Sequence, residues 1–287
     1  MPVPLPFDVP TPLQYFATLV ADDDSLSLVE AAVSLGQDDD PRLDTESVLD
    51  EIEAMVARLR QRVAADAMPL QRLNCLNRYF FGELGFSGNV NDYYDPGNSL
   101  LSTVLRTRRG IPITLAVLYI EMAAGIGLTA RGISFPGHFL VKLRMPGGEV
   151  VIDPFTGRSL SLGQLEELLL PYRRRQGLEG EFDTPLGLFL QAAPARDVLA
   201  RMLRNLKEIY RSAGNWPRLL SVSNRLIVLL PQSWEEHRDR GMVHAELGDD
   251  HAAAQDFSTY LRHAHAAVDR DAVAARLARL KPSGHTD

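Results

Sequence analysis

The carboxy-terminal third of the chain contains an internal repeat of 34 residues, which restricts this part to a stack of helix pairs. Three pairs of positions are separated by this period: Gly214 and Gly248, Leu219 and Ala253, and Ser223 and Phe257. A single helix pair cannot bury its apolar face alone, so units of this kind must stack on one another or on a neighbouring domain. We therefore expect an all-α region from residue 195 to residue 287.

Thirty-four residues is the period of the tetratricopeptide repeat. The second unit has the small and aromatic residues of that motif at Gly241, Gly248, Ala253 and Phe257, and the first contributes Leu206, Tyr210, Gly214 and Pro231. The motif's tryptophan is missing, so the match is partial. Repeats of this type present a surface to extended peptides or helices, which predicts a protein or peptide partner. Packing against the core for stability is the alternative role.

The first 69 residues are predicted to be helical and acidic. Thr11 and Ser25 are suited to cap helices, and Thr45 opens a segment with apolar residues at helical spacing. Residues 1–60 hold 13 acidic and 3 basic side chains. The acidic runs at 22–24 and 38–40 are expected to be solvated charges rather than metal ligands.

The middle of the chain changes from helices to strands. Helices are expected over 69–85 and from Ser99 to Gly110, and another begins at Pro112, because proline suits a first helical turn. Three short runs rich in β-branched and aromatic residues then predict an antiparallel sheet over 128–155. Ser161 is expected to cap a further helix, and residues 171–187 are predicted to be a linker or a surface excursion. The predicted segments are 1–69, 70–194 and 195–287.

Composition excludes several classes of function. The net charge of −7 and the lack of a basic stripe argue against nucleic-acid binding. No apolar run is long enough for a membrane span, and the first residues lack a signal peptide's pattern. A lone cysteine, Cys75, fits a reducing compartment, so we expect a cytoplasmic protein. No cofactor fingerprint or metal motif is present, and His237, His244 and His251 are expected to be surface imidazoles.

Three segments carry a resemblance to a known family: RRGIPITLAVLYIEMAAGIGL at 108–128, FPGHFLVKL at 135–143 and VIDPF at 151–155. Together they resemble the transglutaminase-like domain of bacterial proteins that also carry tetratricopeptide repeats, some of them named as SirB-type invasion regulators. A related domain occurs in an animal F-box protein. The resemblance covers roughly residues 70–265. It implies an α+β fold: a papain-like transglutaminase core with a helical amino-terminal region, followed by an all-α tetratricopeptide-like domain.

The resemblance also implies where a catalytic triad would lie. Such a triad needs a thiolate at a helix start, an imidazole on the next strand and a carboxylate on the strand after it. In the family pattern the nucleophile follows a glycine by two positions, so Gly110 places Pro112 where the thiol should be. His138 and Asp153 match the other two members. Proline offers no nucleophile, which leaves a vestigial dyad.

Three other residues are candidate substitutes for the missing thiol. Cys75 lies among apolar residues of an earlier helix, which is typical of a buried, unreactive thiol. Thr114 carries a hydroxyl two residues after Pro112, but a threonine in a first helical turn commonly bonds the backbone. Ser99 fits helix capping better than catalysis.

Several interpretations of the dyad stay open at this point. His138 and Asp153 either fix two strands together or line a ligand groove, for which the candidate residues are Tyr94, Asp95, Asn98, Arg109, His138 and Asp153. The leading hypothesis is a non-catalytic transglutaminase-like protein that acts as a binding or regulatory module. The alternatives are a hydrolase or acyl transferase using the dyad with Thr114, Cys75 or water, and a structural subunit of a larger complex. The partner and the oligomeric state cannot be read from the sequence.

Overall fold

The computed structural model describes residues 10–177 and 184–280, which form two compact units. The core unit is drawn from Ser27–Gly36 and Arg42–Met202, and the repeat unit from Met1–Leu26, Gln37–Pro41 and Leu203–Asp287. The part of the expected linker at 178–183 lies outside the described residues. The three-segment division at residues 69 and 194 stays a prediction.

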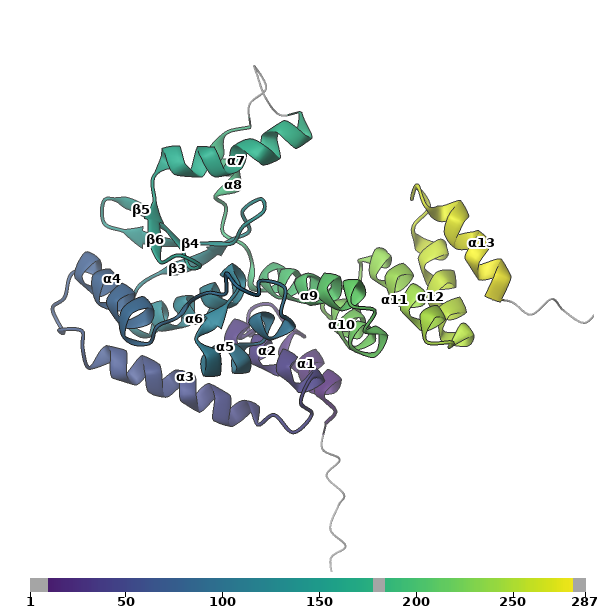
Figure 1. The fold of residues 1–287 in the computed structure, drawn as a ribbon, viewed down its shortest axis with the longest axis horizontal. Coiled ribbons are helices and arrows are strands. Elements are labelled where there is room, and N and C mark those ends of the chain that lie inside the picture. The colour runs from purple at the N-terminus through teal and green to yellow at the C-terminus, as the bar shows by residue number, and fades with distance from the viewer. Residues whose placement is uncertain (1–9, 178–183, 281–287) are drawn as a thin grey trace, which may run out of the picture. The chain divides into compact units, whose positions relative to one another are not determined.

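The core unit contains helices and two small sheets (Figure 1). Its helical elements are α2 (Leu28–Ser34), α3 (Thr45–Arg60), α4 (Pro69–Asn77), the π-helix η2 (Arg78–Glu83), the 3-10 helix η3 (Pro96–Ser99), α5 (Leu101–Thr107), α6 (Pro112–Gly125), α7 (Leu162–Gln176) and α8 (Leu186–Phe189). Its strands are β1 (Ser87–Gly88), β2 (Arg109–Gly110), β3 (Ala130–Ile133), β4 (Leu140–Met145), β5 (Gly148–Asp153) and β6 (Arg158–Leu160). Another 3-10 helix, η1 (Leu35–Asp38), begins in the core unit, as does α9 (Ala195–Ser212), and both end in the repeat unit.

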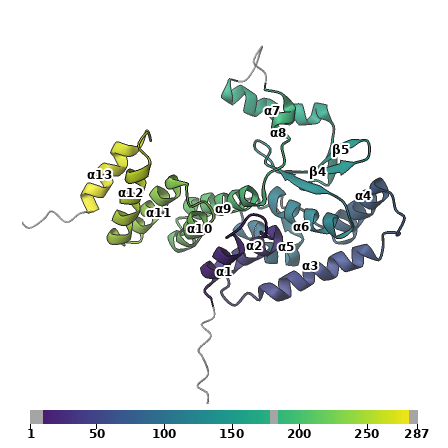
Figure 2. The same cartoon turned by 180° about the vertical axis from the view of Figure 1, so that it is seen from behind.

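The larger sheet is an antiparallel meander in the order β3-β4-β5-β6, with Val141 opposite Ile152. Helix α6 packs on one face and α7 on the other, as the two opposite views show (Figures 1 and 2). Leu165 and Leu169 of α7 are buried in one cluster with Leu140 and Val151 of the sheet. The α+β core predicted from the sequence is therefore confirmed.

Helix α6 is the central helix of the core unit, and most of its residues are buried. Pro112 is its first residue, as expected, because the missing N–H costs nothing at that position. The chain leaves the helix through Gly127, whose φ of +75° favours glycine. Helix α3 approaches so closely that a Cβ on Gly125 would lie 2.2 Å from Val56.

Local expectations met mixed outcomes. Thr11 and Ser161 cap α1 and α7, but α2 is capped by Ser27 rather than Ser25. Asp44 is the cap of the helix that opens at Thr45. The predicted linker after residue 170 is wrong at its start, because α7 runs through Pro171 to Gln176. Pro171 is exposed, so its ring and the carbonyl it leaves unbonded face solvent.

The repeat unit contains α1 (Pro12–Leu19), α10 (Trp216–Leu229), α11 (Trp234–Glu246), α12 (Asp250–His263) and α13 (Arg270–Leu280), with the second half of α9. Successive helices from α10 to α13 pack on one another, which is the helix-pair stack that the 34-residue period predicts. Gly241 lets α11 and α12 approach each other closely, since a Cβ there would lie 2.7 Å from the ring of Phe257 on α12.

Charged residues are unusually well buried in the repeat unit. The guanidinium of Arg225 is paired with Asp38 at 2.7 Å and lies over the ring of Phe16. Asp39 is paired with Arg218 and accepts a hydrogen bond from Tyr210. The expectation that residues 38–40 are solvated is therefore wrong for Asp38, which Arg225 of α10 neutralises, whereas the side chain of Asp39 is 33% exposed.

The expectation of surface imidazoles is also wrong for two of the three regularly spaced histidines, His237 and His244, and the side chain of His244 is only 16% exposed. His237 Nδ1 lies 2.9 Å from Asp256, and its side chain is only 17% exposed.

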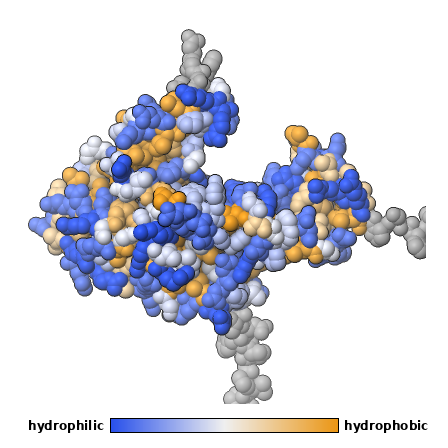
Figure 3. Space-filling model, in the orientation of Figure 1, coloured by the Kyte–Doolittle hydropathy of each residue, from blue (hydrophilic) through white to orange (hydrophobic). Residues whose placement is uncertain are grey.

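Exposed apolar side chains lie on α7 of the core unit, where Leu162, Leu168 and Leu170 reach the surface (Figure 3).

Candidate functional site

The two predicted dyad residues are in direct contact. His138 Nε2 lies 2.9 Å from Asp153 Oδ1. Gly137, with φ of +72°, forms the turn that precedes His138, and β4 begins two residues later. Asp153 is the last residue of β5, the neighbouring strand. The strand pairing that the sequence predicted thus brings together two side chains that are 15 residues apart.

Asp153 is held by three hydrogen bonds. Besides His138, the backbone N–H of Phe155 donates to Oδ1 at 2.9 Å, and the hydroxyl of Thr156 donates to Oδ2 at 2.8 Å. Burial opposes ionisation of this carboxyl group, but these hydrogen bonds outweigh it and lower its pKa. An ionised Asp153 fixes the imidazole with Nδ1 pointing away from the carboxylate, and Nδ1 makes no hydrogen bond within the described residues.

The start of α6 carries no free nucleophile. Pro112 is buried, and the hydroxyl of Thr114 is fully buried within hydrogen-bond distance of the carbonyls of Asn98 (2.7 Å) and Ile111 (3.0 Å). The same hydroxyl oxygen accepts from the N–H of Ile111 at 3.2 Å. Thr114 therefore serves the backbone at the helix start, as a threonine at this position commonly does.

Cys75, like Thr114, is buried beside a backbone carbonyl. It lies in α4 with 8% of its surface exposed, and its sulfur is 3.8 Å from the carbonyl oxygen of Arg62. No hydrogen bond joins it to His138 or Asp153 in the described part of the chain. Ser99 is fully buried in η3 and does not cap α5, whose preceding residue is Leu100.

The loop between β1 and η3 is anchored to the start of α6 through Asn98. The side-chain amide of Asn98 donates to the carbonyl of Asp92 at 2.6 Å and accepts from Asn89 at 3.0 Å. Its own carbonyl accepts from Thr114. Asp95 caps η3 by accepting from the N–H of Gly97. Asn98 and Asp95 thus shape the loop, whereas Tyr94, at its tip, is 77% exposed.

Phe155 connects this loop with the dyad. Its carbonyl accepts from the N–H of Gly88 in β1, and a Cβ on Gly88 would lie 2.3 Å from its ring. Gly88 is paired with Gly110 in β2, immediately before α6. The ring of Tyr93 lies 6.0 Å from that of Phe155. The segment after Asp153 is therefore joined to the segment that leads into Pro112.

Two arginines contact backbone carbonyls near these segments. Arg109, a predicted groove residue, is exposed and donates to the carbonyls of Gly85 and Arg108. Arg201 was not predicted, yet its guanidinium donates to the carbonyl of His138 at 2.7 Å. It lies 63 residues beyond His138, in a segment assigned to the repeats, and no local pattern marks it.

Neither a metal site nor a membrane span is apparent in residues 10–177 and 184–280. No three His, Cys, Asp or Glu residues of these ranges are grouped to hold a metal ion. Within the same ranges, no helix has both the length and the apolar character needed to cross a membrane.

The fold and the residues around His138 define a transglutaminase-like domain followed by tetratricopeptide repeats, and known proteins agree. The Transglutaminase-like superfamily matches residues 46–204, and the tetratricopeptide repeat matches 206–278. The chain belongs to the Transglutaminase-like superfamily.

Its relatives include the UPF0162 proteins. One from Xylella fastidiosa (strain 9a5c) is 38% identical over 84% of this chain and 85% of its own length. The UPF0162 protein YchA of Escherichia coli (strain K12) is 27% identical over 76% of this chain and 79% of its own. Protein SirB1 of Salmonella typhimurium is 27% identical over 77% and 81%. The predicted SirB-type resemblance is thereby confirmed.

Proposed function

We propose that this protein is a non-catalytic transglutaminase-like protein that acts by binding. In this proposal the tetratricopeptide helices contact a protein or peptide partner, and the groove beside His138 takes a second, polar ligand without cleaving it. The observation that carries the proposal is the residue at the start of α6. Pro112 stands where the family pattern needs a thiol, and it has no nucleophilic atom.

The state of the possible substitutes supports the same proposal. The hydroxyl of Thr114 is fully buried among backbone partners, so no substrate carbonyl can reach it without opening the helix start. Cys75 is buried beside the carbonyl of Arg62, a setting that does not stabilise a thiolate. Neither side chain is oriented by the imidazole.

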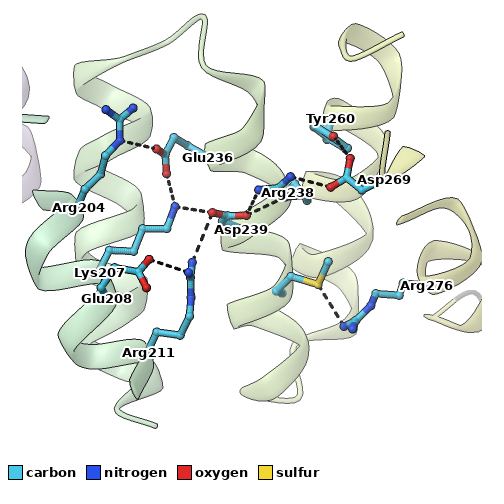
Figure 4. A network of polar contacts seen from close by, with 11 residues as sticks. Arg204, Lys207, Glu208, Arg211, Glu236, Arg238, Asp239, Tyr260, Asp269 and Arg276 are labelled. Carbon is cyan, nitrogen blue, oxygen red and sulfur yellow. Dashed lines mark hydrogen bonds and ion pairs between the residues drawn. The ribbon is translucent and has the colours of Figure 1, made fainter. Parts of the chain in front are cut away.

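The repeats supply the second line of support. Tetratricopeptide repeats generally mediate contacts between proteins, and those of this chain cover residues 206–278. Helices α9 and α11 are fixed to one another by a charge network around Lys207 and Asp239, so their common face is rigid before a partner arrives (Figure 4). A preformed surface binds with little loss of conformational entropy.

The lone buried cysteine supports a reducing compartment, and we propose that the protein works in the cytoplasm.

One observation favours a second candidate function. Asp153 orients the imidazole of His138 and leaves Nδ1 without a partner among the described residues, which is the arrangement of a general base. Such a base would activate water in a hydrolase. The two candidates differ in one measurable respect, because the hydrolase requires turnover that depends on His138.

The deciding experiment treats the purified full-length protein with a panel of acyl and peptide substrates and with a thiol-directed label. The variants are His138→Ala, Cys75→Ala and, as a matched control, His251→Ala at an exposed position of α12. We expect no turnover in any form, and slow labelling of Cys75 that His138→Ala does not change. Turnover or rapid labelling that is lost only in His138→Ala would replace the binding proposal with the enzyme.

A further inference from the structure

Arg201 is held entirely by uncharged acceptors. Its Nη1 donates to the hydroxyl of Ser134 at 2.9 Å and to the carbonyl of Phe135 at 3.2 Å, and its Nη2 donates to the carbonyl of His138 at 2.7 Å. The guanidinium also lies over the ring of Phe139, 5.5 Å from its centre. These contacts fix the cation against the turn that presents the imidazole, but none of them neutralises its charge.

The carboxylate of the dyad is already engaged by other partners. Asp153 accepts hydrogen bonds from His138, Thr156 and the N–H of Phe155, and no ion pair joins it to Arg201. Within the described ranges, no Asp or Glu side chain lies within ion-pair distance of Arg201. Burial lowers the pKa of Arg201, yet arginine stays charged under physiological conditions. A half-buried cation without a counter-charge is unfavourable, and an anionic ligand would relieve it.

The hydrogen-bonding groups that remain are suited to such a ligand. Arg201 Nε makes no hydrogen bond to a described residue, and Nη2 has a second N–H besides the one that it donates to His138. Arginine N–H groups take a carboxylate or phosphate through charge-assisted hydrogen bonds. Burial raises the pKa of the nearby Tyr93 hydroxyl, while the charge of Arg201 acts in the opposite direction. That hydroxyl makes no hydrogen bond within the described part, so it is available as a donor.

We propose that Arg201 and Tyr93, beside the turn that presents His138, form a binding site for an oxyanion group, a carboxylate or a phosphate, with Arg201 as its charged partner and the Tyr93 hydroxyl as a further donor. This inference rests on the proposed function, in which the groove binds a ligand without cleaving it. It also separates this chain from an enzyme that recognises a neutral amide, because the uncompensated charge of Arg201 discriminates against an amide.

The test compares a carboxylate with the matching amide. Histidine side-chain resonances of the full-length protein are followed by NMR during titration with N-acetylglycine, N-acetylglycine amide and inorganic phosphate, at an ionic strength held constant with sodium chloride. We expect saturable shifts of the His138 resonances with the acid or with phosphate, and none with the amide. The acid and phosphate arms distinguish the two sources of the oxyanion.

Variants assign the site to Arg201. Arg201→Gln should weaken oxyanion binding by at least about tenfold, because a charge-assisted contact is lost. The matched control is Arg131→Gln, an exposed arginine of β3 whose guanidinium reaches only its neighbouring carbonyl. If Arg201→Gln loosens the His138 turn, Tyr93→Phe keeps the test intact, since it removes one hydroxyl and should weaken binding by about fivefold.

Two results would overturn the inference. Binding of the amide at least as tight as that of the acid would show that charge is not recognised, and unchanged oxyanion binding in both Arg201→Gln and Tyr93→Phe would place the site elsewhere. Neither result bears on turnover. His138-dependent turnover of acyl substrates would overturn the proposed function separately.

Discussion

The ammonium group of Lys207 lies 2.5 Å from a carboxylate oxygen of Glu236, and both side chains are almost fully buried. Lys207 belongs to α9 and Glu236 to α11, so this ion pair joins two helices of the repeat unit (Figure 4). Asp239 accepts from the same ammonium group at 2.6 Å and is also paired with Arg211 and Arg238. Removal of this cation would leave the buried Glu236 with only Arg204, at 3.5 Å, among the described residues, whereas Asp239 would keep its two arginines.

Lys207→Met should destabilise the repeat unit by about 3 to 5 kcal/mol, the cost of breaking a buried pair by removing one partner. The measurement is urea unfolding followed by tryptophan fluorescence. Both tryptophans of the chain, Trp216 and Trp234, lie in the repeat unit, so the signal reports on that unit alone. The ring centroids of Trp234 and His263 are 3.9 Å apart, so the fluorescence intensity also depends on this histidine. The midpoints of unfolding are therefore compared rather than the intensities.

The matched control for this prediction is Arg211→Met. Arg211 is paired with Glu208 and Asp239 but is 43% exposed, so its loss should cost less than about 1 kcal/mol. A Lys207→Met, Glu236→Leu double variant should recover part of the lost stability, because the charge left alone by the single change is removed. Equal effects of Lys207→Met and Arg211→Met would mean that the central pair has no special role.

The repeat unit should lose stability in acid. Burial opposes ionisation of Asp256, but hydrogen bonds from Arg240 and His237 outweigh it and lower its pKa below the ordinary value of 3.8. Burial also opposes ionisation of Asp239, but its interactions with Lys207 and Arg238 outweigh this effect and lower its pKa. A carboxyl with a depressed folded-state pKa contributes stability above its unfolded pKa and loses it as pH falls through the folded value.

Urea midpoints of the repeat unit should therefore be nearly constant from about pH 7 to pH 5 and fall steeply below about pH 4. Asp256→Asn should lower the midpoint at pH 7 and flatten the fall in acid, since one of the carboxyl groups with a lowered pKa is gone. An acid slope that is unchanged in Asp256→Asn would assign the pH dependence to other carboxyl groups.

Gly88→Ala tests the link between the dyad and the start of α6. The added Cβ would lie 2.3 Å from the ring of Phe155, which must then move and take the segment after Asp153 with it. We expect a loss of about 1 to 3 kcal/mol and a change of the His138 side-chain resonances. Calorimetry of the full-length protein measures the first and NMR the second. Gly147→Ala is the control, because nothing lies within 4 Å of its added Cβ, and it should change neither quantity.

The features that the sequence predicted well are local or periodic. Proline at a first helical turn marks the start of α6 at Pro112. Two short runs of β-branched and aromatic residues, joined by a Pro-Gly-Gly signal, predict the hairpin that brings His138 beside Asp153. The 34-residue period is found by comparing the sequence with itself. In each case the deciding contacts lie within a few residues or recur at a constant spacing, so a pattern records them.

The features that were missed depend on residues far apart in the chain. Asp38 read as a solvated charge because its partner, Arg225, follows 187 residues later. Arg201 carries no motif, and its role arises only when the start of α9 lies against the turn at His138. Pro171 was taken as a helix end, but tertiary packing of the leucines before it keeps α7 continuous. Tertiary packing overrides local helix propensity wherever burial stabilises the helix by more than the unfavourable residue destabilises it.

Pro112→Cys should create a reactive thiol if the vestigial site keeps the family geometry. In a Cys75→Ala background the new thiol is the only one, and its thiolate absorbance near 240 nm can be followed against pH without a bulky label reaching a buried position. The positive end of α6 and the imidazole held by Asp153 should both favour the thiolate, so it should form below the ordinary pKa of about 8.5. His138→Ala in the same background should move the titration back toward that value. Leu162→Cys, at the exposed start of α7, controls for the helix end alone. A titration that His138→Ala leaves unchanged would mean that His138 and Pro112 do not share one site.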